Sequence, residues 1–356
     1  MPPSAHEPSS FPLNLCHVSS RWRYLVFGIP EMWTCIRVEA FGKTHPRSHR
    51  NILDVRTEQI KMWFKNAKGR PFALYLDLTS IEPTPGQMVN GQWTRFLRFV
   101  LIERAKSLRG LHLVFTDPNF YDEIFRPGST MFPILEEIRL QYQSIFAGIQ
   151  FLNLEQFHLF IDFNNGHHSK FDWSPSQRYH DHFLAQLNGL RVLSIVNPGD
   201  ISEKQLIEVF ESVPRLEKLA LDVGCFAHPR LLYALNESED GSPSLMPDLK
   251  EVYVFLERVE PFFNEDNGDI TMRSIAQMVS TRSLARGTHA ALQKAVFWTH
   301  DPYGRLSGRR WKDCERTLKT QLDNTFGLDS SVHSVWDSSD WFSWWTGTSA
   351  IEDKCL

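Results

Sequence analysis

The stretch that decides the fold is residues 190–221, which read LRVLSIVNPGDISEKQLIEVFESVPRLEKLAL. Both ends of this stretch carry the same short pattern: a leucine, two residues, an apolar residue, one residue and a second apolar residue. The first copy is Leu190–Leu193–Ile195 and the second is Leu216–Leu219–Leu221. Within each copy the last two apolar positions are two residues apart, a spacing that places both side chains on one face of a β-strand. Each copy therefore predicts a turn into a short strand.

The segment between these two copies, Ile201 to Pro214, predicts an amphipathic helix. Ser202 and Gln205 have the spacing of a capping box at the start of such a helix. The apolar residues that follow recur at helical spacing and form one stripe: Leu206, Val209, Phe210 and Val213. A strand, a turn, a helix and a second turn thus make one structural unit.

The same leucine-led pattern recurs along most of the chain. Further copies are Leu108–Leu111–Leu113, Leu135–Ile138–Leu140, Leu154–Phe157–Leu159, Leu249–Val252–Val254 and, in degraded form, Leu292–Ala295–Phe297. The central positions of consecutive copies are separated by 27, 19, 36, 26, 33 and 43 residues, whereas regular leucine-rich repeats have a period of about 20–29. We therefore predict an α/β fold, an irregular leucine-rich-repeat solenoid with a parallel sheet and outer helices. The alternative is an ordinary α/β domain whose buried strands begin with leucine.

Composition restricts the classes of protein to which this chain can belong. It has 356 residues, of which 26 are Phe, 11 Trp and 8 Tyr, and its formal net charge is −4. So many aromatic residues argue against disorder over most of the chain. The nearly balanced charge argues against a general nucleic-acid or anionic-membrane binder, and the sequence has no run of 18 apolar residues that would predict a membrane span.

The five cysteines, Cys16, Cys35, Cys225, Cys314 and Cys355, are scattered, odd in number and never spaced as C-x-x-C. This usage predicts reduced, mostly buried thiols. It favours a cytoplasmic or nuclear protein, or one found in both compartments.

The N-terminal residues 13–38 read LNLCHVSSRWRYLVFGIPEMWTCIRV. Five apolar residues fall at helical spacing and predict one helix with an apolar stripe: Leu15, Val18, Trp22, Leu25 and Ile29. Pro30 ends this helix, and Met32-Trp33 precede a short apolar strand. A lone helix of this length is marginal in water and needs a partner.

This stretch resembles the C-terminal half of an F-box, in the version found in the large fungal family of F-box proteins with degenerate leucine-rich repeats. The matching positions are Leu15, Val18, Trp22-Arg23, Pro30 and Met32-Trp33, and Trp63-Phe64 with Gly69-Arg70-Pro71-Phe72 looks like the linker before the family's first repeat strand. The resemblance covers residues 13–78. The Leu-Pro-x-Glu-x-Leu-x-x-Ile-Phe helix with which the family's motif opens is absent from this sequence. We therefore expect either an F-box-like segment that is truncated at its N-terminus or a protein that has lost ligase recruitment.

The resemblance implies a non-catalytic substrate-recognition subunit of a Skp–cullin–F-box ubiquitin ligase. Six residues would then bind the Skp-type adaptor and, through it, a cullin: Leu15, Val18, Trp22, Leu25, Pro30 and Trp33. The strand face of the repeats would bind an unknown protein substrate through positions that flank the inward residues: His112, Arg139, Gln141, His158, Asp222 and Tyr253. The resemblance implies no catalytic residue, metal, cofactor, nucleic acid or membrane.

The sequence also predicts how the chain is divided. The expected segments are a disordered tail (1–12), the F-box-like remnant (13–38), a basic linker and helix (39–71), the solenoid (72–300), and a C-terminal helix with a Trp-rich cap (301–356). Within the linker, Lys43 to Arg70 carries eight Lys/Arg against two Asp/Glu. We interpret this excess as a solvated helix face and linker, the alternative being a phosphate-binding patch. Helices are predicted over 57–68 and 93–106, and a strand over 72–78.

Two further features leave alternatives open. The loop 166–182 holds His167, His168, His180 and His182 beside Asp172 and Asp181. We interpret it as a solvated insertion, the alternative being a metal-dependent enzyme. Trp336, Trp341, Trp344 and Trp345 crowd the C-terminal tail, where they would either cap the solenoid or bind a partner. A second functional hypothesis is a leucine-rich-repeat interaction module that does not recruit a ligase.

Overall fold

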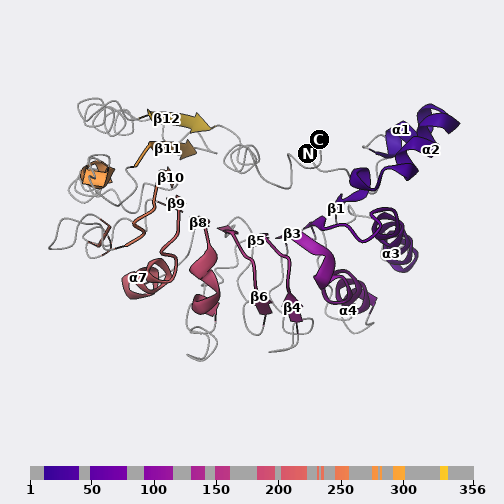
Figure 1. Cartoon of the computed structure of the whole chain (residues 1–356), viewed down its shortest axis with the longest axis horizontal. Helices are drawn as coiled ribbons and strands as arrows, with labels where there is room; N and C mark the ends of the chain where they lie inside the picture. Colours follow the sequence, from indigo (N-terminus) through magenta and orange to yellow (C-terminus); the bar gives the residue numbers. More distant parts are fainter. Residues whose placement is uncertain are drawn as a thin grey trace. The chain divides into compact units, whose positions relative to one another are not determined.

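A computed structural model of the chain describes residues 12–39, 49–77, 92–114, 130–140, 149–160, 183–196, 202–222, 231, 234–235, 245–255, 275–279, 281–282, 292–300 and 329–335 (Figure 1). These residues belong to two compact units. Unit 1 contains the described residues up to Leu154, and unit 2 contains those from Glu155 onward. The His-rich loop 166–182 and the tryptophans of the tail lie outside the described residues.

Unit 1 is built on parallel strands that follow one another in chain order. They are β1 (Cys35–Glu39), β2 (Phe72–Asp77), β3 (Leu108–Val114) and β5 (Glu137–Leu140), and each pairs in parallel with the next. A separate two-stranded sheet is formed by β4 (Thr130–Phe132) and β6 (Ile149–Phe151). A parallel sheet whose neighbours are consecutive strands is the arrangement that the repeated pattern predicted.

Unit 2 continues in the same manner. Its strands are β7 (Gln156–Phe160), β8 (Val192–Val196), β9 (Lys218–Asp222), β10 (Glu251–Phe255), β11 (Lys294–His300) and β12 (Asp329–Val335), again parallel and in chain order. All seven copies of the leucine-led pattern therefore end in a strand. The α/β solenoid prediction is confirmed, whereas the Ser-rich strand β12 carries no such pattern and was missed.

Helices lie beside the strands, and most occur where the sequence predicts them. In unit 1, α3 (His49–Asn66) ends at a left-handed turn formed by Lys68 and Gly69. The second predicted helix is α4 (Gln92–Leu97), which continues as the π-helical segment η4 (Arg98–Glu103) and the 3-10 turn η5 (Ala105–Ser107). In unit 2, α7 (Glu203–Glu211) begins with the predicted capping box between Ser202 and Gln205.

Each repeat of unit 2 enters its strand through the same backbone hydrogen bonds. The carbonyl group just before one strand accepts two N–H groups from the start of the next repeat. The acceptors are Glu155, Arg191, Glu217 and Lys250, and the N···O distances lie between 2.7 and 3.1 Å. The leading leucines Leu190, Leu216, Leu249 and Leu292 are buried. The N–H groups of the first three donate to carbonyls three residues earlier, and the N–H of Leu292 donates to the carbonyl of Arg282. The repeated leucine therefore fixes the point at which each strand begins.

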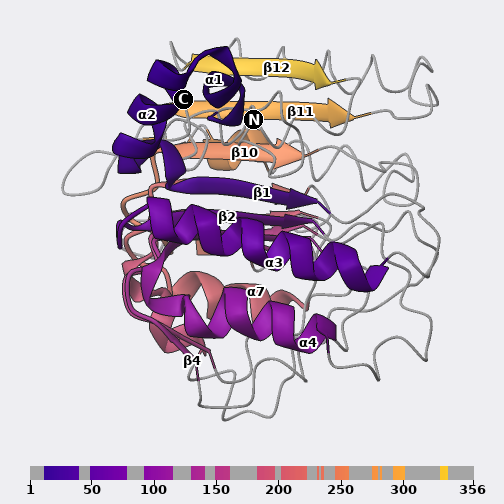
Figure 2. The same ribbon diagram turned by 90° about the vertical axis from the view of Figure 1, so that its right-hand side faces the viewer.

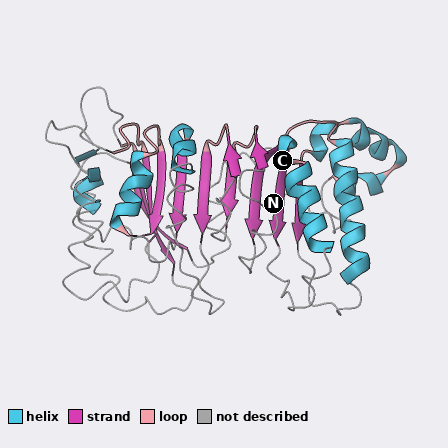
Figure 3. Ribbon diagram, turned by 90° about the horizontal axis from the view of Figure 1, so that it is seen from below, coloured by secondary structure: helices cyan, strands magenta, loops and turns pink. Residues whose placement is uncertain are grey.

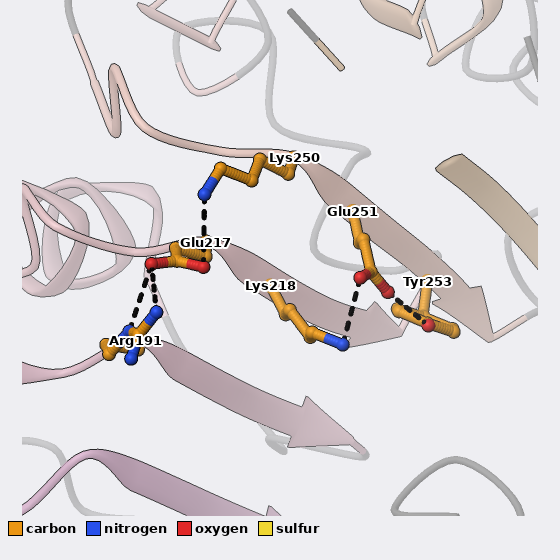
Figure 4. Close-up of polar contacts among 6 residues, drawn as sticks. All are labelled: Arg191, Glu217, Lys218, Lys250, Glu251 and Tyr253. Atoms are coloured by element: carbon orange, nitrogen blue, oxygen red, sulfur yellow. Dashed lines mark hydrogen bonds and ion pairs between the residues drawn. The ribbon is translucent and has the colours of Figure 1, made fainter. Parts of the chain in front are cut away.

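Charged side chains reinforce the same edge of the sheet (Figure 4). Glu217 accepts hydrogen bonds from Arg191 at 2.6 Å and forms an ion pair with Lys250 at 3.3 Å, and Lys218 contacts Glu251 at 2.9 Å. Burial raises the pKa of Glu217, but hydrogen bonds from Arg191 and Lys250 outweigh burial and leave this pKa below its usual value. We call this set of contacts the ion-pair ladder; it joins three successive repeats of unit 2.

A buried arginine connects the segments that lie between β9 and β11. The guanidinium of Arg282 donates to the backbone carbonyls of Leu235, Leu245 and Met246, and Arg282 is 3% exposed. Desolvation lowers the pKa of Arg282 to about 10, so this group remains protonated at neutral pH. One side chain thus satisfies three carbonyl groups that would otherwise be buried without donors.

The ion-pair ladder predicts that stability depends on pH. A carboxylate whose folded pKa is lowered contributes stability that is present above its unfolded pKa and is lost as the pH falls through the folded value. For Glu217 that loss begins near pH 4.5, the ordinary value of the group. We expect Glu217→Gln to lower the free energy of unfolding at pH 7, measured by urea denaturation, by less than about 1 kcal/mol because the pair is partly exposed. The substitution should also make this free energy depend less on pH below 4.5. Glu211→Gln, an exposed glutamate of α7, is the control. Equal pH profiles for wild type and Glu217→Gln would contradict this role.

For Arg282 we expect a larger loss. Arg282→Met keeps a long apolar chain but removes all donors to three buried carbonyls, and we expect it to lower the free energy of unfolding by about 3 kcal/mol. Urea denaturation followed by circular dichroism measures the change. Arg215→Met, at an exposed position of the same unit, should change stability by less than about 0.5 kcal/mol. A small effect at Arg282 would show that the carbonyls find other donors.

Candidate protein-interaction site

The N-terminal segment forms two helices where the sequence predicted one. These are α1 (Leu13–Val18) and α2 (Ser20–Gly28), followed by the 3-10 turn η1 (Pro30–Trp33). The chain is extended at Ser19, whose hydroxyl accepts the N–H of Trp22 and caps α2. Serine favours such a cap over a helix interior because its side chain competes for backbone hydrogen bonds. The single-helix prediction is wrong at this residue.

Apolar side chains are exposed along this segment. The structure describes eight exposed large apolar residues, and six of them lie between residues 18 and 29: Val18, Trp22, Tyr24, Leu25, Phe27 and Ile29. Trp22 is 45% exposed and Leu25 is 42% exposed. A cluster of exposed apolar residues is typical of a protein-interaction surface. We call these six residues the apolar patch.

The predicted adaptor-binding residues divide into two groups. Val18, Trp22 and Leu25 belong to the apolar patch, whereas Leu15 and Pro30 are partly buried. Trp33 is fully buried, and its indole N–H donates to the carbonyl of Val26 at 2.9 Å. The structure therefore does not offer Trp33 itself to a partner.

Trp33 instead fixes α2 to the rest of unit 1. Its ring stacks on Phe27 with a centroid distance of 5.0 Å and meets Trp63 of α3 edge-on at 4.9 Å. The indole N–H of Trp63 donates to the carbonyl of Cys35 in β1. An ion pair at 2.6 Å between Glu31 and Arg70 joins the same parts of the chain. The two tryptophans thus hold the helix that carries the apolar patch.

The two described cysteines differ in their state. Cys16 of α1 is a free, buried thiol; burial raises its pKa, and the nearby Arg23 partly opposes this rise. Cys35 is bonded through a disulfide, so the prediction of reduced cysteines is wrong at this position. Sequence spacing did not reveal this bond, because cysteines far apart in the chain can meet in space.

The strand positions expected to bind a substrate are mostly buried. Arg139 and His158 are each 1% exposed, Tyr253 is 6% and Asp222 is 7% exposed. His112 is partly buried, and Gln141 lies outside the described residues. The prediction that these positions are exposed is wrong for the first four. We call this face of the strands, opposite the leucine positions, the inner face.

Packing within the inner face explains this burial. In unit 2, Val196, Ala220, Tyr253, Phe255 and Val296 form one apolar cluster across neighbouring strands. Strands that are buried on both faces have nearly continuous apolar sequences. Residues 192–196, which read VLSIV, have such a sequence. This signal could have revealed the burial.

The inner face of unit 1 carries buried charge. Arg139 forms an ion pair with Glu137 at 2.5 Å, and both side chains are 2% exposed. His112 is paired in register with Arg139 and with Tyr75 of β2. Burial, together with the charges of Arg139 and Arg37, holds the pKa of His112 well below its usual value. The histidine is therefore neutral at physiological pH.

No metal or membrane site is found in the part of the chain that the structure describes. Within those ranges, no three His, Cys, Asp or Glu side chains gather as metal ligands. None of the helices described there is long and apolar enough to span a membrane. The loop 166–182, on which the metal-enzyme alternative depends, is not covered by these findings.

Together these features define an α/β repeat protein of the irregular leucine-rich-repeat type with an exposed apolar patch on its N-terminal helices. No protein-family model and no curated protein matches the chain. One solved structure that resembles it is the leucine-rich repeat-containing protein LegL7 from Legionella pneumophila. The identity is 15% and the TM-score 0.38, and the alignment covers 83% of this chain and 92% of that one.

The contrast between Trp22 and Trp33 is testable. Trp33→Ala removes a fully buried indole and its hydrogen bond, and we expect it to lower the free energy of unfolding by about 3–5 kcal/mol. We expect Trp22→Ala, at an exposed position, to change it by less than about 0.5 kcal/mol. Urea denaturation followed by circular dichroism measures both. Similar losses for the two variants would contradict their placement.

Proposed function

We propose that this chain is the substrate-recognition subunit of a Skp–cullin–F-box ubiquitin ligase. The resemblance of residues 13–78 to the C-terminal half of an F-box suggests this role. The observation that supports it best is the apolar patch, because three of the six residues that the resemblance assigns to adaptor binding are exposed there: Val18, Trp22 and Leu25. In this proposal the adaptor covers α2.

The physical basis of adaptor binding is the removal of apolar surface from water. Full burial of one large apolar side chain contributes about 1.5–3 kcal/mol, and the patch contains six partly exposed ones. Association must first offset the loss of translational and rotational freedom. A helix already fixed by Trp33 and Trp63 loses less conformational freedom when it binds. The two buried tryptophans would therefore act indirectly, by holding the patch in place.

In the proposed role the chain performs no covalent chemistry. It would hold a protein substrate near a ubiquitin-loaded enzyme, so that its contribution is proximity. These partners place the protein in the cytoplasm, the nucleus or both. The substrate would bind the repeat surface, where the strand-entry edge offers exposed charged side chains. There, Arg191 is 54% exposed, and Lys218 and Lys250 are each 39% exposed.

A second candidate function is a repeat-based interaction module that does not join a ligase. The burial of Trp33 favours it, because one of the six assigned adaptor-binding residues is not available on the surface. The same apolar patch would then bind a different protein. The two functions differ in one observable, which is binding to a Skp-type adaptor.

The ligase proposal predicts that the full chain co-purifies with a Skp-type adaptor when the two are co-expressed. The double substitution Trp22→Ala/Leu25→Ala removes two anchors of the apolar patch, and we expect it to weaken adaptor binding at least about 30-fold, measured by calorimetry. An N-terminally extended version that restores a complete F-box should be tested alongside. If neither version binds the adaptor, the ligase proposal fails and the interaction-module function is favoured.

Met131→Ala/Leu152→Ala is the matched control. Met131 is 49% exposed and Leu152 is 61% exposed, and they are the two exposed large apolar side chains of the described residues outside the apolar patch. This variant should bind the adaptor with unchanged affinity. Equal weakening by both double substitutions would show that binding depends on general surface hydrophobicity.

A further inference from the structure

A second surface of unit 1 is defined by charge. Helix α3 and the segment formed by α4, η4 and η5 lie side by side, as two views show (Figure 2; Figure 3). Each precedes a strand, and the two strands, β2 and β3, are paired in parallel from Phe72 and Leu108 onward. The C-terminal ends of both helical segments therefore lie at the same edge of the sheet.

A cation–aromatic cluster holds the two segments together. Phe64 of α3 and Phe99 of η4 meet edge-on, with their centroids 6.4 Å apart. The guanidinium of Arg104 lies 5.2 Å from the first ring and 5.3 Å from the second, and the ammonium of Lys61 lies 5.7 Å from Phe99. Two cations thus share one pair of rings, whose faces attract positive charge.

The two helical segments joined by this cluster carry an excess of positive charge. Six cationic residues define what we call the basic face: Lys61, Lys65, Lys68, Arg98, Arg104 and Lys106. All are exposed except Arg104, which is partly buried. Arg95 of α4 is exposed as well, and the exposed carboxylates described on the same elements are Glu58 and Glu103, so the excess is seven minus two, or five positive charges. The whole chain has a net charge of −4.

Most of these cations have no carboxylate partner among the residues that the structure describes. Lys61 pairs with Glu58 at 2.7 Å. Within the ranges that the structure describes, no ion pair is formed by Lys65, Lys68, Arg98, Arg104 or Lys106. In unit 2, by contrast, Arg191, Lys218 and Lys250 are each paired in the ion-pair ladder. Like charges on one face repel each other, and an anionic partner would relieve this repulsion.

The chemistry of the basic face identifies the kind of anion. Single-stranded nucleic acid needs free aromatic faces for stacking, but Arg104 already covers Phe64 and Phe99. Peripheral membrane binding uses exposed apolar side chains beside the cations, and none of the exposed large apolar residues described belongs to α3, α4, η4 or η5. An acidic polypeptide needs neither feature, because carboxylates pair directly with lysine and arginine.

We propose that the basic face is a docking surface for an acidic segment of a partner protein. It is separate in sequence from the apolar patch and does not depend on the ligase function. The partner would align Asp and Glu side chains along the C-terminal ends of α3 and η4. Because the pairs are exposed, binding would be fast and sensitive to salt rather than tight.

The test uses the full-length protein and a fluorescein-labelled oligo-glutamate peptide, with binding followed by fluorescence anisotropy at low salt. The triple substitution Lys65→Gln/Arg98→Gln/Lys106→Gln removes three exposed cations that make no ring contact. We expect it to weaken binding roughly tenfold or more. Lys204→Gln/Arg215→Gln, which removes two exposed cations of unit 2, should leave binding unchanged. Circular dichroism and melting temperature establish that the variants are folded.

Four results would overturn the proposal. One is equal peptide affinity of the wild type and the triple variant. Another is tighter binding, lost in the triple variant, to a DNA oligonucleotide of the same charge, which would assign the face to nucleic acid. The third is the same pattern with vesicles that contain phosphatidylserine. Retention of peptide binding in Trp22→Ala/Leu25→Ala would separate this surface from the adaptor site, and its loss there would count against a separate basic face.

Discussion

The hydrogen bonds at the entry of each strand are the constraint on which the repeat structure depends. In unit 2 one carbonyl per repeat accepts two N–H groups from the next repeat, at Glu155, Arg191, Glu217 and Lys250. Along the chain, the N–H donors of successive repeats are separated by the same irregular intervals as the leucine-led patterns. The inserted residues therefore lie between the strand entries, and the register of neighbouring strands is unchanged. Loop length costs little free energy when the ends of the loop are fixed. This explains how repeats of such unequal length can pair as parallel strands within unit 2.

The strand entries also determine where charge is placed. A side chain just before a strand lies next to its equivalent in the following repeat, so Arg191, Glu217 and Lys250 alternate in sign along the edge. The N-terminal end of unit 1 is held together mainly by the packing of tryptophan side chains. There, Trp33 and Trp63 fix the entry helices to β1 through ring contacts and two indole hydrogen bonds. The tryptophan enrichment of this end therefore reflects packing inside the unit as well as exposure on its surface.

The sequence was sufficient to locate the repeat strands but not to predict which side chains are exposed. A buried leucine at each turn and period-2 spacing are local signals, and they located every repeat strand described except β12. Exposure is not local, because it depends on what neighbouring strands contribute to the same face. Ser194 is completely buried although it is polar, and Tyr253 is buried within the inner-face cluster. The nearly continuous apolar run at residues 192–196, interrupted only by Ser194, contained this information, since it is typical of strands with no solvated face.

The basic face is another surface that the sequence alone did not identify. The charge excess of residues 43–70 is visible in the sequence, and alone it is compatible with a solvated helix. Its meaning changes because Arg104, more than 25 residues further along the chain, lies over Phe64 of the same helix, and Arg98, Arg104 and Lys106 form no ion pair with any carboxylate that the structure describes. A solvated helix face tolerates like charges when they lie farther apart than about 10 Å, the distance over which salt screens them. The rings of Phe64 and Phe99 account for the placement of Lys61 and Arg104, whereas the exposed cations that make no ring contact are the ones that an acidic partner would neutralise.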